Sequence, residues 1–275
     1  MSERFEQFIR ERQYLQNVSP RTIQWYREAF KWLDDEQPDQ QALKMFVIRM
    51  RERGLKASSC NNRIRAVNAY LNWSDSALRL PKLKEEQRML PSFSVDDVRK
   101  FSQWKPRTRT QKRLQVLISL LADTGCRISE ALDLIWSDVD FENLLLTLHG
   151  KGAKDRRVPI SFDLRRLLFR LKQSSNFEKV FSTRSGGSLM RLNILRDVKL
   201  LCARLGIVTP ERTLHAFRHG FALHYLRNGG STFHLQKCLG HSSLEMTRRY
   251  ANLMTEDLQR IHERVSLLSA AKGVR

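Results

Sequence analysis

The sequence predicts a mainly α-helical protein with one small antiparallel β-sheet, divided into two domains. Apolar residues recur at helical spacing along most of the 275 residues, strand-like runs occur at one place, and a proline-containing segment interrupts the helical pattern. The composition, with 41% hydrophobic and 28% charged residues, is typical of a globular protein. It excludes a disordered or fibrous chain.

Residues 1–74 are predicted to form a helical bundle. Ser19 and Pro20 suit a helix start, because a hydroxyl caps the helix and proline takes its first position. Asp39 is expected to open the next helix, and Ser58 or Ser59 the last one. The apolar stripes of this bundle contain Phe5, Phe8, Ile9, Ile23, Tyr26, Phe30, Leu33, Phe46, Val47, Met50, Ile64, Val67, Tyr70 and Leu71.

Residues 75–92 are predicted to link this bundle to a second domain over 93–275, because Pro81 and Pro91 lie in a stretch without periodicity. The spacing of Ser94 and Asp97 predicts a capping box at the first helix of the second domain.

The sheet prediction rests on two short strand-like runs, 144–148 and 157–160, which flank a turn that contains glycine. Helices are expected again beyond Ser161. Their predicted starts are Ser188, Thr213, Ser231 and Ser242, and their predicted ends are Gly206, Gly229 and Gly240.

The chain is strongly basic, since 49 Lys and Arg against 29 Asp and Glu give a formal net charge of +20. This excess indicates a polyanionic partner and favours nucleic acid over a merely solvated surface. No apolar run approaches the roughly 18 residues that cross a bilayer, and the start of the chain has no hydrophobic signal core. We therefore expect a cytoplasmic protein that does not contact the membrane.

The four cysteines, Cys60, Cys126, Cys202 and Cys238, form no CxxC pair. This spacing argues against a disulfide framework and against a cysteine-based zinc site.

Two segments around the predicted hairpin hold charged residues suited to chemistry. In TGCRISE, Arg127 and Glu130 lie on one helix face, an arrangement that by itself is better explained as a surface ion pair. The turn HGKGAKDRR, residues 149–157, holds two lysines and two arginines beside glycines that permit close approach of a ligand. A lysine there can reach a DNA groove, or donate a proton if burial lowers its pKa.

A third segment, LHAFRH, places His215 and His219 four residues apart, a spacing that zinc metalloproteases also use. Such sites need a glutamate after the first histidine, where this chain has Ala216, and Arg218 would repel a metal ion. An anion site is the better interpretation, because Arg218 can grip a phosphate with two parallel hydrogen bonds while His215 moves a proton. His219 is expected to pack or cap.

The fourth segment, LGHSSLEMTRRY, places His241 before a predicted helix start and Tyr250 nine residues later. A lone tyrosine on a helix is ordinarily a core or interface residue. In company with two arginines, two histidines and a lysine, however, Tyr250 suits the dianionic transition state of phosphoryl transfer.

In order, type and spacing, these four segments resemble the signature motifs of the tyrosine recombinase (phage integrase) family, and they are most similar to its Xer-type bacterial members. The resemblance covers about residues 92–250. It extends more weakly to the N-terminal bundle, which resembles the family's all-helical, SAM-like core-binding domain. The resemblance implies an α+β catalytic domain after this bundle, with a tail helix at about 255–268.

The resemblance also implies a role for each matching residue. Tyr250 would attack the scissile phosphate and form a 3′-phosphotyrosyl link, leaving a free 5′-hydroxyl. Arg127 and Arg218 would clamp the non-bridging oxygens, as guanidinium forks do well. Lys151 would be the general acid for the departing 5′ oxygen, with Lys154 as the competing candidate in the same turn.

The resemblance further implies residues for proton transfer, for support of the site and for DNA binding. His215 would accept the tyrosine proton, His241 would hydrogen-bond the phosphoryl group, and Glu130 would orient Arg127 or His215. Gly220 departs from the serine or threonine often found at its position in the family. The expected DNA contacts are Arg63, Arg65, Lys154, Arg156 and Arg157.

The function implied is site-specific recombination on double-stranded DNA. A homotetramer on two DNA sites would exchange strands through a Holliday junction, with or without a second recombinase or an accessory protein. No metal or cofactor is expected, because the phosphotyrosine diester preserves the energy of the broken bond.

Two alternatives are a DNA-relaxing enzyme like type IB topoisomerases and a catalytically silent DNA-binding protein. The N-terminal bundle and an apolar stripe in the tail favour the recombinase over the topoisomerase, and the filled motif positions argue against a silent protein. That stripe consists of Leu258, Ile261, Val265 and Leu268.

Overall fold

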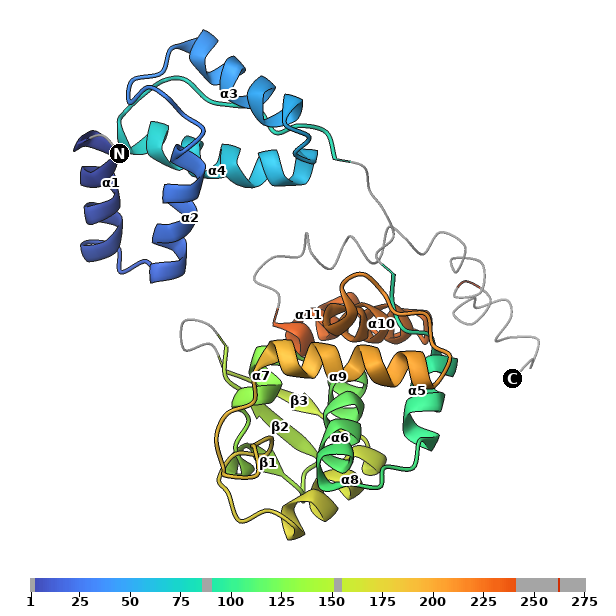
Figure 1. Ribbon diagram of the computed structural model, residues 1–275. Helices are drawn as coiled ribbons and strands as arrows, with labels where there is room; N and C mark the ends of the chain where they lie inside the picture. Colours follow the sequence, from blue (N-terminus) through green and yellow to red (C-terminus); the bar gives the residue numbers. More distant parts are fainter. Residues whose placement is uncertain (1–2, 86–90, 151–154, 241–261, 263–275) are drawn as a thin grey trace. The chain divides into compact units, whose positions relative to one another are not determined.

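The computed structural model describes residues 3–85, 91–150, 155–240 and 262, and its contacts divide the chain into two compact units, Met1–Arg88 and Met89–Arg275 (Figure 1). Each unit has its own hydrophobic core. The described residues form helices and one three-stranded antiparallel sheet, so the predicted fold class is confirmed. No described helix is both long and apolar enough to cross a membrane.

The first unit is a bundle of helices. Ser19 and Asp39 cap their helices as predicted, by accepting hydrogen bonds from Thr22 N and Ala42 N. The last helix begins at Ala57, not at Ser58 or Ser59, because the Lys56 carbonyl already accepts from the N–H groups of its first turn. The bounds are α1 (Glu3–Tyr14), α2 (Pro20–Phe30), α3 (Gln40–Glu52) and α4 (Ala57–Trp73).

Aromatic rings hold α1, α2 and α4 together. Phe8 lies edge-on to Tyr26 and to Tyr70, with ring centroids 4.9 and 5.5 Å apart, and Phe5 stacks on Phe30 at 4.4 Å. The Tyr70 hydroxyl donates to the Glu36 carbonyl at 2.7 Å, and burial raises the pKa of Tyr70 to about 12. These contacts give the bundle a core of its own.

The segment after α4 differs from the predicted linker over 75–92. The Asn68 side chain exchanges two hydrogen bonds of 2.9 Å with the backbone of Leu80, and Asn61 does the same with Leu83 at 2.8 and 2.9 Å. Leu80 is buried in the core of the bundle. The first half of the predicted linker therefore packs on the first unit, because two asparagine amides satisfy its backbone.

The second unit is arranged around α6 (Arg109–Thr124), which contacts five other helices (Figure 1). Ser94 and Asp97 form the predicted capping box of the first of them. Ser231 caps the last helix as predicted, whereas Ser188 starts no helix, since α9 begins at Arg191. The other helices are α5 (Val95–Gln103), α7 (Ile128–Asp133), a 3-10 turn η1 (Trp136–Asp138), α8 (Phe162–Gln173), α9 (Arg191–Arg204), α10 (Thr213–Arg227) and α11 (Thr232–Leu239).

The sheet has the order β1 (Val139–Asp140), β2 (Leu145–Leu148) and β3 (Arg156–Pro159), and all its pairings are antiparallel. The β2–β3 pair is the predicted hairpin, whereas β1 is too short for its sequence to show alternation. Leu148 pairs with Arg156, and Thr147 with Arg157. Since successive side chains leave a strand on opposite faces, the two arginines of β3 point in opposite directions.

Candidate active site

The centre of the site is a cluster of one carboxylate and two arginines. Arg156 of β3 donates from Nη1 and Nη2 to the two oxygens of Glu130, at 2.9 and 2.8 Å. Glu130, in the first turn of α7, also accepts from the backbone N–H and from Nη1 of Arg127, at 2.7 and 2.8 Å. A single carboxylate therefore fixes both arginines, and the cluster keeps a net positive charge.

Glu130 remains ionised although only 5% of its side chain is exposed. Burial by itself would raise the pKa of this carboxyl. The hydrogen bonds from Arg156 and from the Arg127 backbone, together with the positive charge of Arg156, instead lower the pKa to about 2. Arg127 keeps 40% of its side chain exposed, so it presents a cation at the surface of the cluster.

Arg218 of α10 reaches the same region from another side. Its Nη1 donates to the Gly125 carbonyl at 3.0 Å and its Nη2 to the Leu239 carbonyl at 2.8 Å. Gly125 lies two residues before Arg127, and Leu239 is the last residue of α11. Arg218 therefore connects the loop that carries Arg127 to the end of α11.

His215 lies one turn before Arg218 on α10, in strongly positive surroundings. Desolvation lowers the pKa of its imidazole, and the charges of Arg218, Arg191, Arg212 and Arg127 lower it further. A neutral imidazole at pH 7 is able to accept a proton.

His219 is more deeply placed than His215. The two rings lie 6.1 Å apart, and burial, His215 and Arg218 lower the pKa of His219 to about 4. Among the described residues, no group of three or more His, Cys, Asp or Glu side chains is placed to hold a metal ion. The surroundings of both histidines favour an anion.

A further charged group lies where β2 and β3 meet the turn between them. His149 lies between two carboxylates, with Nε2 at 2.9 Å from Asp138 and Nδ1 at 3.0 Å from Asp155. Hydrogen bonds to Asp138 and Asp155 raise the pKa of His149. When protonated, the ring bridges the two ends of the turn that contains Lys151 and Lys154.

Comparison with protein families identifies the family of this chain. The model of the phage integrase family matches residues 92–257. The chain belongs to that family. It is 32% identical to tyrosine recombinase XerA of Pyrococcus furiosus over 94% of this chain and 93% of the relative. It is 28% identical to tyrosine recombinase XerC of Xanthomonas campestris pv. campestris (strain B100), over 94% and 86% of the two chains.

The fold is also that of solved members. The structure of the Tn1549 transposon integrase in complex with transposon right end DNA has a TM-score of 0.78 and 21% identity, and the alignment covers 96% of this chain and 98% of that one. The family's enzymes cleave and rejoin DNA, and this member is therefore a DNA-recombining enzyme.

The structure of this family member brings together Arg127, Glu130 and Arg218, with His215 beside them. The other expected catalytic residues, Lys151, His241 and Tyr250, lie outside the described residues, as does Lys154. Gly220, which departs from the family pattern, faces the Phe93 carbonyl: a Cβ atom there would lie 2.8 Å from that oxygen, so a larger residue requires a shift of α10 or of Phe93.

The expected DNA contacts of this recombinase separate into two groups. Arg157 is exposed, and so is Arg65, whose guanidinium lies over the Trp25 ring at 5.7 Å. Arg63 lies over Trp32 at 5.7 Å and is half-buried. Arg156 differs from all three, because its side chain is 11% exposed and its donors face protein atoms. This geometry suits support of Arg127 better than contact with DNA.

Two features of the site were not found from the sequence. The His149 bridge was missed because Asp138 lies outside the turn, and because nothing in the turn sequence pairs His149 with Asp155. The inward direction of Arg156 was missed as well. The alternation of the strand carried a signal for it, since Val158, on the same face, is buried.

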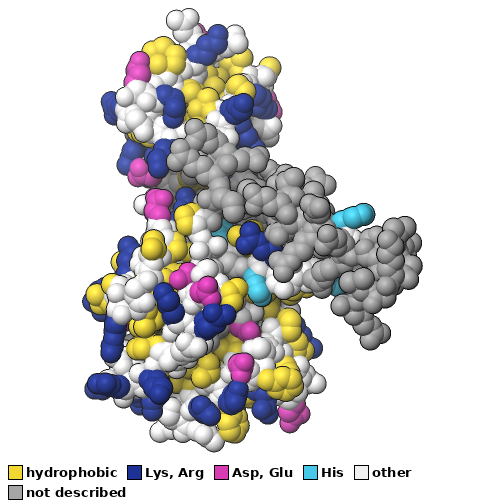
Figure 2. Space-filling view, turned by 90° about the vertical axis from the view of Figure 1, so that its right-hand side faces the viewer, with side chains coloured by type: hydrophobic (Ala, Val, Ile, Leu, Met, Phe, Trp, Pro, Cys, Tyr) yellow, Lys and Arg dark blue, Asp and Glu magenta, His cyan; other side chains and the backbone are white. Residues whose placement is uncertain are grey.

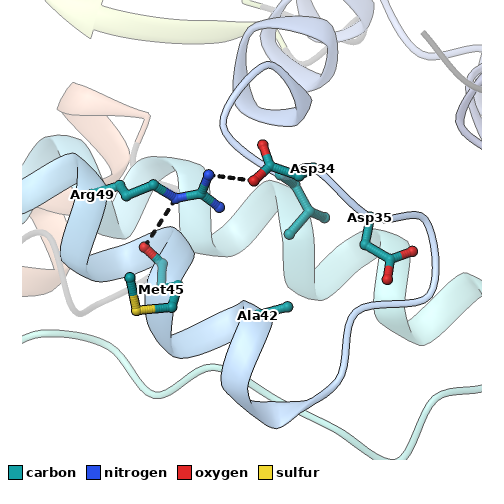
Figure 3. Close-up of a pocket in the computed structure, with 6 residues that line it drawn as sticks. Asp34, Asp35, Ala42, Met45 and Arg49 are labelled. Atoms are coloured by element: carbon teal, nitrogen blue, oxygen red, sulfur yellow. Dashed lines mark hydrogen bonds and ion pairs between the residues drawn. The ribbon is translucent and has the colours of Figure 1, made fainter.

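The described surface shows spread charged side chains (Figure 2) and a hollow on the first unit. In the view of Figure 2, Lys and Arg side chains are spread over the described surface of each unit, with Asp and Glu side chains between them. A hollow on the first unit is lined by Leu33, Asp34, Asp35, Ala42, Met45 and Arg49 (Figure 3). Arg49 pairs with Asp34 and donates to the Met45 carbonyl, so the charges of the hollow are largely engaged.

Proposed function

We propose that this family member is a site-specific recombinase that cuts double-stranded DNA with Tyr250, forms a 3′-phosphotyrosyl intermediate and exchanges strands through a Holliday junction. The outcome is integration, excision or resolution of DNA. The proposal rests mainly on the convergence of Arg127, Arg218 and His215, which belong to separate motifs, on one positively charged region held by Glu130.

The proposal gives each residue the role that its family motif implies. Arg127 and Arg218 stabilise the charge that develops on the non-bridging oxygens, and His215, neutral at pH 7, takes the proton of Tyr250 as it attacks the phosphate. The phosphodiester bond to the 5′ oxygen breaks as the bond to Tyr250 forms. Lys151 then supplies a proton to the 5′ oxygen, and His241 hydrogen-bonds the phosphoryl group.

The decisive test is Tyr250→Phe on a duplex nicked near the cleavage point, which traps the covalent protein–DNA complex because the short cleaved strand diffuses away. The wild-type chain is expected to accumulate this complex and Tyr250→Phe to form none, while both bind the duplex with similar affinity. A covalent complex with Tyr250→Phe would disprove Tyr250 as the nucleophile, and loss of binding would make its role structural.

The two lysine candidates are separated by a substrate whose bridging 5′ oxygen is replaced by sulfur. A thiolate leaves without prior protonation, because a thiol has a pKa of about 8.5 and an alcohol a far higher one. Lys151→Ala is expected to be slow on the oxygen substrate and close to wild type on the sulfur substrate. The same pattern for Lys154→Ala, with Lys151→Ala unaffected, would reverse the assignment.

We further propose a homotetramer on two DNA sites, acting in the cytoplasm on the nucleoid. The solved integrase in complex with transposon DNA supports the DNA partner. The apolar stripe of the predicted tail helix suits docking on a neighbouring copy. Deletion after Met254 that preserved tetrameric synapsis, seen by gel shift with two DNA sites, would contradict the role of the tail. A second recombinase or accessory protein is tested by recombination with the purified chain alone.

A further inference from the structure

We propose that Arg156 is a positioning residue for DNA cleavage, which holds Arg127 through Glu130 and at the same time anchors the C-terminal end of α11. The inference rests on the proposed function and extends it to a residue that contacts Glu130, the partner of Arg127. Arg156 joins three elements, β3, α7 and α11, that are far apart in the sequence.

The donors of Arg156 are aimed at protein atoms. Its Nε donates to the Cys238 carbonyl at 2.8 Å, and its two terminal nitrogens engage both oxygens of Glu130 in a fork. Only a guanidinium offers this planar set of donors, and a lysine at the same place would act as a point charge. Arg156 therefore fixes the orientation of the Glu130 carboxylate in addition to balancing its charge.

Arg156 constrains the position of Arg127 through their shared partner, Glu130. Glu130 Oε1 accepts from Nη1 of both arginines. Its Oε2 accepts from the Arg127 backbone N–H and from Nη2 of Arg156. Arg127 keeps 40% of its side chain exposed, and its Nη1 is held by Glu130 at 2.8 Å. Glu130 supplies that constraint, and Arg156 fixes Glu130.

The second anchor is the end of α11. The last carbonyls of a helix have no partner within the helix and carry partial negative charge. Arg156 binds the carbonyl of Cys238, and Arg218 binds that of Leu239, so two cations hold this end. The chain continues from here to His241, whose own placement lies outside the described residues.

Gly240 shows how closely the chain passes Arg156. Its φ of +64° places it in the left-handed region, and a Cβ atom there would lie 3.0 Å from Cδ and 3.1 Å from Nε of Arg156. Since Arg156 is held at its other end by Glu130, it cannot swing away without breaking the fork. Glycine at this position therefore allows the anchor to form.

The test compares variants in formation of the covalent complex on the nicked duplex at saturating protein. Arg156→Met is expected to slow this single-turnover step about 100-fold, as displaced catalytic groups do. Its affinity for intact DNA should change by less than about threefold, because Nε, Nη1 and Nη2 of Arg156 each bind a protein atom and its side chain is only 11% exposed. Arg165→Met is the matched control: Arg165 is also half-buried and donates from Nε to a backbone carbonyl, that of Phe141 at 2.7 Å, outside the cluster.

A second variant separates positioning from simple stabilisation. Arg156→Met alone leaves a buried carboxylate with one cation fewer, which destabilises the fold, whereas Glu130→Gln combined with Arg156→Met leaves no unpaired buried charge. The double variant is expected to regain most of the thermal stability and to remain slow in cleavage. Recovery of the cleavage rate together with stability would overturn the inference.

The outcomes also distinguish this inference from the proposed function. A wild-type chain that forms no covalent complex would disprove the proposed function. A wild-type chain that forms the complex, with Arg156→Met equally fast, would overturn the positioning role alone. Loss of DNA affinity in Arg156→Met in proportion to its loss of cleavage would make Arg156 a DNA contact and would also overturn the role.

Discussion

The arginines of the two units are used in contrasting ways. In the first unit, Arg63 and Arg65 lie over the faces of Trp32 and Trp25. In the second unit, Arg156 and Arg218 are directed inward to a carboxylate and to backbone carbonyls, and they connect helices. A stacked arginine keeps its charge near the surface, where it adds to affinity, whereas a buried arginine with fixed donors adds to geometry. We therefore expect the net charge of +20 to serve two functions, which experiments are able to separate.

The largest expected effect is on cleavage when Arg218 is replaced, because this arginine is buried. Arg218→Lys keeps the charge and most of the volume but removes the fork that binds Gly125 and Leu239. We expect single-turnover cleavage to fall about 1000-fold, as with loss of a transition-state donor, and DNA affinity to fall much less. Equal losses of affinity and cleavage would remove the contrast between the units.

The next effect concerns stability at acid pH. Glu130 has a folded pKa of about 2, below its ordinary 4.5, so its carboxylate stabilises the fold fully above about pH 4.5, and this stability is lost as the pH falls towards 2. Glu130→Gln should lower the free energy of unfolding by on the order of 3 kcal/mol at pH 6 and by clearly less at pH 3. Urea unfolding at both pH values measures the difference.

The control for Glu130 is an exposed ion pair of the same unit. Asp163 pairs with Arg166, and their side chains are 82% and 63% exposed. Asp163→Asn should change the free energy of unfolding by about 0.5 kcal/mol or less at either pH. Effects of equal size in the two variants would mean that burial of the Glu130 cluster has no energetic consequence.

A smaller effect is expected in the first unit. If Arg65 contacts phosphate, Arg65→Met should weaken DNA binding severalfold and reduce the slope of log affinity against log salt by about 0.9. Cleavage at saturating DNA should stay at the wild-type rate. Arg166→Met, which removes an exposed arginine from the second unit, is the comparison for non-specific loss of charge. An unchanged salt slope in Arg65→Met would show that the stacked arginine does not contact phosphate.

Local signals in the sequence were sufficient for several helix starts and for the hairpin. Caps such as Ser19, Asp39 and Ser231 act within three residues, so residue type and spacing reveal them. The start of α4 was misplaced, because Lys56 caps it with its backbone and leaves no side-chain signal.

Contacts between distant segments could not be predicted in the same way. Arg156 meets Glu130 across 26 residues and Cys238 across 82, and no periodicity joins them. Family motifs predicted Arg127, Glu130, His215 and Arg218 as functional residues. The motifs did not show that a fifth residue, Arg156, predicted as a DNA contact, binds both oxygens of Glu130.

The smallest effect is expected from replacing His149, which lies at the turn end of the β2–β3 hairpin. Hydrogen bonds to Asp138 and Asp155 raise the pKa of His149, so its stabilising contribution is full below the ordinary value of about 6.5 and is lost as the pH rises through the raised value. His149 is 55% exposed, so the contribution should be below about 1 kcal/mol. His149→Ala should therefore unfold with a flatter dependence on pH between about 6 and 8 than the wild type. His234→Ala, an exposed histidine of α11 that lacks the two aspartate contacts, should keep the wild-type profile. If both variants behave alike, the bridge does not hold the hairpin, and the Arg156 fork is the main attachment of β3 to the site.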